Sequence, residues 1–268
     1  MEKKKTNKAP LKPWPYVTGK PVDGKTALSA IKFCLATVGM LVAFLFLGAM
    51  MMWNNLLLRV LLNAVLLLFG YVIFWQSGLN AGTGAVNRGE ILYQRQATGR
   101  ENDAREIEES YHPMKGFIVG LLGSIPLFLC ALGLALTAQR VMSTAGALPG
   151  WLATLERREE IGNALVAYHQ SVSMSVTDIL RLIIRMALMP LVNIIGGENK
   201  EGLLLLERVS PLLVLIPGLC YGVGYRGGVW VRTRVHADIE KGKRRIKRRQ
   251  KRERQQRSRP NKGPEQLN

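Results

Sequence analysis

Long apolar runs alternate with charged segments along this chain. Each of the longest runs has about the twenty residues that an α-helix needs to cross a bilayer. Hydrocarbon excludes unpaired backbone groups, so such runs are expected to be helical. The pattern therefore predicts an all-α integral membrane helical bundle with four transmembrane helices, at 33–53, 56–75, 116–138 and 209–230.

The segments between these runs predict how the helices are connected. Residues 54–55 leave room for a tight turn, so the first two spans should form a helical hairpin. Residues 76–115 alternate in charge and predict a polar loop with a short solvated helix near Ile107 and Tyr111. Ser210 followed by Pro211 is typical of a helix N-cap and a first-turn proline, which predicts that the last span begins there.

The segment 139–208 is ambiguous. Within it, 178–195 is apolar except for Arg181 and Arg185 at helical spacing, so it is either a span or a helix lying at the membrane surface. Glu156 and Glu160 recur one turn apart, and they are candidate ion-pair partners of the two arginines if the segment folds back on itself. A functional alternative makes the arginines an anion or substrate contact.

Charge decides between these topologies. The formal net charge of +18 is concentrated at the ends, with seven lysines and two acids in 1–25 and fifteen bases and three acids in 226–259. Basic flanking segments resist transfer across the membrane, so both ends are expected to be cytoplasmic in the cell membrane. An even number of spans follows. Four spans with an interfacial helix at 178–195 keep both ends cytoplasmic. Five spans would place the basic C-terminal tail outside, and six spans remain an alternative.

This topology divides the chain into three parts. A basic cytoplasmic tail at 1–27, extended or disordered, precedes a transmembrane domain at 28–230. That domain includes a cytoplasmic loop at 76–115 and an extracytoplasmic segment at 139–208. A second basic cytoplasmic tail, disordered or conditionally helical, covers 231–268.

The second tail is the strongest candidate for a binding surface. We expect it to lie along the anionic inner leaflet of the bilayer, since each nearby base adds about 1 kcal/mol of attraction. RNA or the ribosome is an alternative partner through phosphate neutralisation, and the run also serves to fix topology. The residues of this surface are Lys241, Lys243, Arg244, Arg245, Lys247, Arg248, Arg249, Lys251 and Arg252.

Small residues in the last span predict close helix packing. The spacing of its glycines lets two helix backbones approach each other. Packing within the chain is the favoured use, and contact with another membrane subunit is the alternative. The glycines are Gly218, Gly222, Gly224 and Gly228.

No catalytic, cofactor-binding or metal-binding motif is recognised in the sequence. It contains no P-loop, HExxH pair or nucleophile elbow, and its cysteines and histidines are scattered. We therefore expect a non-enzymatic accessory or structural subunit of a membrane assembly, without a cofactor. One alternative is a transporter component whose path is lined by Asn63, Arg181, Arg185 and the helix breaks at Pro126 and Pro217. Another is a ribosome- or insertion-associated factor.

Overall fold

The computed structural model describes residues 13–51, 53–138, 175–197 and 199–257, which form helices and connecting segments without a β-strand. Four of the helices contain a stretch long and apolar enough to cross a membrane. The chain is therefore an all-α, multi-pass membrane protein, which confirms the predicted fold class. These helices are α1 (Gly24–Met50), α2 (Leu56–Ala97), α4 (Lys115–Thr137) and α8 (Lys200–Arg257).

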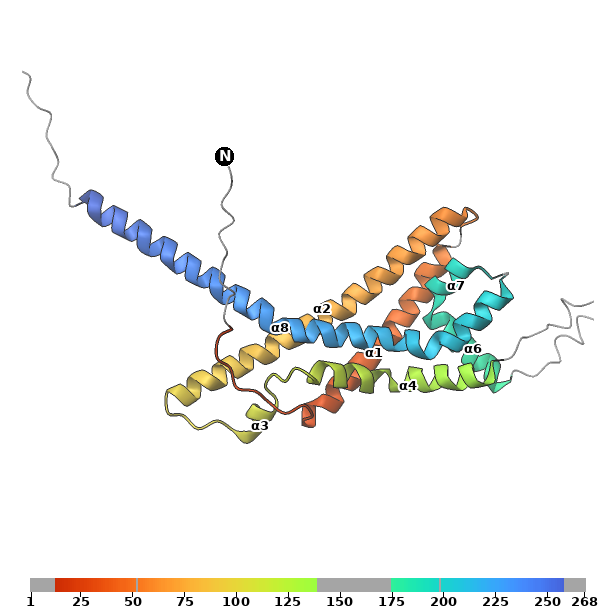
Figure 1. The fold of residues 1–268 in the computed structure, drawn as a ribbon, viewed down its shortest axis with the longest axis horizontal. Helices are drawn as coiled ribbons and strands as arrows, with labels where there is room; N and C mark the ends of the chain where they lie inside the picture. The colour runs from red at the N-terminus through yellow and green to blue at the C-terminus, as the bar shows by residue number, and fades with distance from the viewer. Residues whose placement is uncertain (1–12, 52, 139–174, 198, 258–268) are drawn as a thin grey trace, which may run out of the picture.

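Helix α8 lies at the centre of the bundle (Figure 1). It packs along α2 and α4, whereas α1 packs mainly against α4 and scarcely touches α2. Glycines allow this closeness, because a side chain on Gly120 of α4 would overlap the backbone of Gly218 in α8, and one on Gly78 of α2 would overlap that of Tyr221. Helices α2, α4 and α8 thus form the tightly packed part of the bundle.

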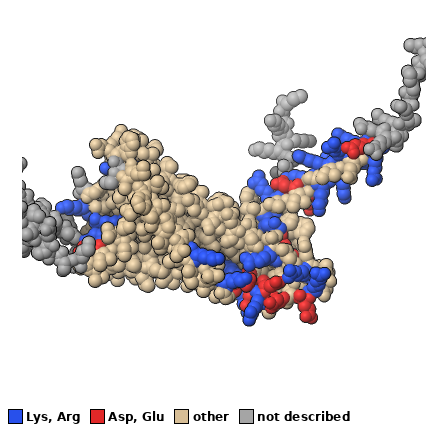
Figure 2. All heavy atoms as spheres, turned by 180° about the vertical axis from the view of Figure 1, so that it is seen from behind, with Lys and Arg blue, Asp and Glu red and all other residues tan. Residues whose placement is uncertain are grey.

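Charged side chains gather toward the ends of the molecule (Figure 2). The larger collection surrounds the short helix α3 (Ala104–Glu108) and the far part of α8, and a broad surface with few charges separates it from the opposite end. We call the end near α3 the charged end and the end near the 54–55 turn the hairpin end. The broad uncharged surface fits contact with lipid.

Helix α2 is longer than its apolar run predicts. It continues to Ala97, so the predicted loop at 76–115 is wrong over its first half. The small residues Gly78, Gly82 and Ala85 are buried on one face of this extension. Contact of Gly78 and Gly82 with the α8 backbone explains why a polar, glycine-rich segment remains helical. The predicted short helix is present as α3, and Tyr111 lies buried just beyond it.

Helix α8 begins earlier and ends later than predicted. Asn199 caps its start, where its side-chain oxygen accepts a 2.9 Å hydrogen bond from the Gly202 amide. Ser210 and Pro211 lie inside the helix, so the predicted N-cap is wrong. Pro211 lacks the amide that would bond the carbonyl of Glu207, and the Ser210 hydroxyl donates to that carbonyl at 2.7 Å instead. The basic tail is helical as far as Arg257.

The ambiguous segment is two short helices rather than one. Helix α6 (Val176–Ala187) has 12 residues and α7 (Met189–Ile195) has 7, and Pro190 lies in the first turn of α7. At 1.5 Å per residue, neither helix crosses a hydrocarbon core of about 30 Å. Both lie at the hairpin end, where α6 packs mainly against α4 and α1, and α7 packs mainly against α2 and α1. The predicted single helix over 178–195 is therefore wrong.

The segment 13–23 runs as an extended strip across the charged end. The amide of Val17 donates to the Gly89 carbonyl at 3.1 Å, and that of Gly19 donates to the Tyr111 carbonyl at 3.0 Å. The expectation of an extended segment holds for these residues. They are nevertheless fixed to the bundle, because the extended backbone finds partners on α2 and on the segment before α4.

Candidate functional site

An ion-pair cluster centred on one buried carboxylate occupies the hairpin end. The Glu207 side chain, 3% exposed, accepts hydrogen bonds from Arg181 Nε at 2.9 Å and Arg185 Nη2 at 2.6 Å. Arg181 also reaches Asp178 at 3.3 Å. One carboxylate on α8 thus holds both arginines of α6 and lowers the cost of placing them beside lipid.

This pairing differs from the one that the sequence suggested. Glu156 and Glu160 lie outside the described residues, and the partner that the structure provides is Glu207. Glu207 was not among the predicted ion-pair residues. One feature of the sequence does point to Glu207: it is an acid that precedes an apolar run. A carboxylate near lipid is costly unless a base lies against it, so a basic partner is expected.

Asn63 and Asn193 form a second polar cluster near the hairpin. The Asn193 side-chain amide donates to the Gly48 carbonyl at 2.8 Å, and that of Asn63 donates to the Arg59 carbonyl at 2.8 Å. Both side chains are buried. The cluster ties the end of α1, the start of α2 and the helix α7 together.

A third cluster joins the two ends of the described chain. Buried Glu90 of α2 accepts from Arg232 Nη2 at 2.5 Å, and His236 Nε2 lies 3.0 Å from both carboxylate oxygens. The Trp14 ring stacks on His236 with centroids 4.5 Å apart and planes 7° apart. The N-terminal strip and the far part of α8 therefore meet at the charged end.

Asp23 links the start of α1 to the start of α4. Its carboxylate accepts a 2.5 Å hydrogen bond from Lys115 Nζ and another from the Thr26 hydroxyl. Burial by itself would raise the pKa of Asp23. The hydrogen bonds from Lys115 and Thr26, with the charge of Lys115, outweigh burial and hold this pKa below its ordinary 3.8.

The four predicted packing glycines all lie in α8 against other helices of the chain. Gly218 meets Gly120, and Gly222 meets the Phe117 ring, both on α4. Gly224 and Gly228 face the backbone of α2 near Trp75 and Gly82. The residues of the tail surface, in contrast, lie exposed along α8 at 241–252.

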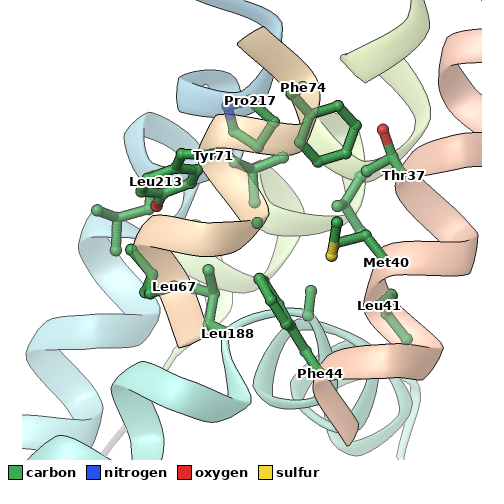
Figure 3. Close-up of a pocket in the computed structure, with 14 residues that line it drawn as sticks. Thr37, Met40, Leu41, Phe44, Leu67, Tyr71, Phe74, Leu188, Leu213 and Pro217 are labelled. Atoms are coloured by element: carbon green, nitrogen blue, oxygen red, sulfur yellow. The ribbon is translucent and has the colours of Figure 1, made fainter. Parts of the chain in front are cut away.

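An apolar pocket opens between α1 and α2 (Figure 3). Phe44 and Met40 line it from α1, Leu67 and Phe74 from α2, and Pro217 from α8. The other candidate path residues do not join it, because Asn63 belongs to the asparagine cluster and Arg181 and Arg185 to the Glu207 cluster. The structure therefore does not gather the candidate transport residues around one cavity.

The polar clusters consist of groups that neutralise or hydrogen-bond each other, an arrangement that fixes helices relative to one another. Within the described residues, no three His, Cys, Asp or Glu side chains are placed to hold a metal ion. No protein-family model, curated protein or solved structure matches the chain.

Proposed function

We propose that this protein is a non-enzymatic accessory subunit of a membrane assembly. In this proposal, four helices anchor it in the cell membrane, and the part of α8 beyond the bundle docks a partner subunit on the cytoplasmic side. The positive-inside rule supports cytoplasmic placement of the charged end. The contact of Trp14 with His236 is consistent with both basic ends lying on one side.

The length and course of α8 support the docking role. Its 58 residues extend for about 87 Å, roughly twice the thickness of a bilayer. Beyond the bundle the helix points away from α2 and α4 (Figure 1). A surface-bound tail would use the charges on one side of the helix, whereas a projecting helix can present all of its faces.

A stripe of apolar side chains on this part of α8 is the observation that carries the proposal. Val235, Ile239 and Ile246 are 40%, 48% and 59% exposed, respectively. Their spacing of four and seven residues places them on one face of a helix. We call these three residues the apolar stripe. Its steps of four and seven residues fit the heptad of a coiled-coil seam, with Gly242 at the intervening position.

The charges beside the apolar stripe suggest the chemistry of the partner. Asp238, Glu240 and Glu253 pair with bases on α8 itself, but they are far outnumbered by the bases of 241–254. An amphipathic partner helix with acidic flanks would cover the stripe and neutralise the bases. Such flanking charges set partner choice in coiled coils.

Purification of the full chain from its own membranes in mild detergent tests this proposal. Ile239→Asp and Ile246→Asp should release a stoichiometric partner. Gln255→Asp, which adds the same charge to an exposed position on the opposite face of α8, should retain it. A photo-crosslinker at position 246 should mark an acidic helical segment of that partner.

Other outcomes favour the alternative functions. If the tail binds membranes only when anionic lipid is present, binding to the inner leaflet is favoured. If ribonuclease removes the co-purified partner, the ribosome-associated role is favoured. A lone protein that moves a solute in liposomes favours transport. Retention of the same partner by both Ile239→Asp and Ile246→Asp would contradict docking through the apolar stripe.

A further inference from the structure

A groove separates α1 from α2 over much of their length. The two helices are joined at the hairpin but diverge, and they touch where the Phe44 ring covers Gly70 and where Phe33 approaches Phe74 at 5.3 Å between centroids. Three adjoining hollows follow this line. They share residues from one to the next, Met40 and Phe74 between the first two and Lys32 between the last two.

The hollow nearest the hairpin end is apolar. Side chains of α1 and α2 form its sides, and Leu213 and Pro217 of α8 close it toward the bundle (Figure 3). The Thr37 hydroxyl at its edge donates to the Phe33 carbonyl of its own helix, so it does not offer a free donor to a ligand. This hollow suits a hydrocarbon chain.

The hollow nearest the charged end is polar and carries excess positive charge. Four bases line it, Lys25, Lys32, Arg88 and Lys115, against the two acids Asp23 and Glu109, which leaves a net charge of +2. Lys115 is neutralised by Asp23, and Lys25 and Arg88 share Glu109. Among the described residues, no carboxylate lies within ion-pair distance of Lys32.

The position of Lys32 matches the headgroup level of a membrane. It directly precedes the apolar run of α1, which begins at Phe33. From Lys32 to Phe44 the helix rises about 18 Å at 1.5 Å per residue. One leaflet contributes about half of a hydrocarbon core of about 30 Å. The groove therefore runs from headgroup level across about one leaflet.

We propose that this groove binds one anionic phospholipid. An acyl chain lies between α1 and α2 beside Met40 and Phe74, and the phosphate lies against Lys32 with Lys25 and Arg88 nearby. The apolar lining of the first hollow fits a hydrocarbon chain, and Lys32, which has no described carboxylate within ion-pair distance, favours an anion at the other end of the groove. A phospholipid of negative net charge in the leaflet at the charged end combines the two.

The binding test compares lipids of equal chain length. The full chain, stripped of lipid in detergent, is titrated with phosphatidylglycerol or phosphatidylcholine and followed by native mass spectrometry. We expect tighter retention of one phosphatidylglycerol. Because a base near an anionic headgroup contributes about 1 kcal/mol, Lys32→Gln should weaken this binding about fivefold.

Two further variants locate the site. Ala36→Trp, which fills the second hollow, should also weaken binding. Arg100→Gln removes an exposed base between α2 and α3, outside both the groove and the basic tail, and should leave binding unchanged. A photoactivatable phosphatidylglycerol should label α1 and α2 near Met40 and Phe74. Lys32 and Ala36 are exposed, so unchanged melting temperatures will show that the variants fold. Equal retention of both lipids, or equal binding by wild type and Lys32→Gln, would overturn the proposal.

Discussion

The side-chain amide of Asn193 donates a 3.0 Å hydrogen bond to the side-chain oxygen of Asn63, although the two residues belong to helices far apart in the sequence. The contact lies inside the bundle, where both residues are buried. It places α7 against the helical hairpin. Apolar packing has no preferred direction, whereas a hydrogen bond between two side chains does. The asparagine pair therefore fixes the position of α7 along the helical hairpin.

Asn193→Ala should therefore destabilise the hairpin end. The substitution removes the donor that serves both Asn63 and the Gly48 carbonyl, and hydrogen bonds between membrane helices contribute roughly 1–2 kcal/mol. Thermal unfolding in detergent measures the loss. Asn80→Ala is the matched control, because Asn80 is exposed on α2, and it should leave the melting temperature nearly unchanged.

Glu207→Gln should have a larger effect. Removing one partner of a buried ion pair leaves the other charge uncompensated, at a cost of roughly 3–5 kcal/mol. Here Arg181 keeps its 3.3 Å contact with Asp178, and Arg185, which loses its carboxylate, is partly exposed, so we expect a loss near the lower end of this range, about 3 kcal/mol. Chemical unfolding of the detergent-solubilised protein measures the change. Glu253→Gln, in an exposed pair with Arg249, should cost far less, and equal losses for the two variants would contradict the importance of burial.

Gly218→Leu should disrupt the packing between α4 and α8. A side chain at this position overlaps the Gly120 backbone, which cannot rotate away, so we expect a loss of about 1–3 kcal/mol or more. Gly84→Leu offers a control within a long helix, because nothing lies within 4 Å of an added Cβ there. Melting temperatures should fall for the first variant and not for the second.

Acid should loosen the N-terminal strip through Asp23. Its pKa is lower in the folded protein than in the unfolded chain, so the stabilisation is present above the unfolded value of 3.8 and is lost as pH falls through the folded value. Hydrogen exchange of 17–26, corrected for the intrinsic rate, measures this loss. Asp23→Asn should expose the strip even at neutral pH and remove most of the acid dependence.

Labelling of single cysteines tests orientation. We expect a membrane-impermeant maleimide added to intact cells to modify Gly197→Cys at the hairpin end and to spare Lys243→Cys on α8. Both positions are exposed, and the native cysteines are half-buried and can be replaced. Labelling of Lys243→Cys from outside would contradict cytoplasmic ends.

The sequence predicted the helices that cross the membrane but not where they end. The length of the apolar runs predicts which segments cross, because a helix needs about twenty apolar residues to span the hydrocarbon. Each predicted span coincides with a long helix, although 33–53 runs three residues past the end of α1 and 116–138 one residue past the end of α4. Helix ends depend on packing as well. Gly82 resembles a loop residue until the α8 backbone is placed beside it, and Pro211 resembles a helix start until Ser210 is seen to satisfy the freed carbonyl.

The polar clusters were harder to foresee, because each joins residues distant in the chain. Arg181 and Arg185 were recognised from their helical spacing, but Glu207 could be assigned to them only after α6 was placed against α8. The same holds for Glu90 and Arg232. The periodicity of one sequence predicts which residues share a face of a helix. It does not predict which other helix packs against that face.

The stacking of Trp14 on His236 has a consequence for biosynthesis. A ribosome makes Trp14 more than two hundred residues before it makes His236. The segment 13–23 therefore lacks its aromatic partner until the apolar part of α8 has been made and inserted. The Trp14–His236 contact at the charged end therefore forms only after α8 is inserted, and a chain whose synthesis stops before His236 cannot form it.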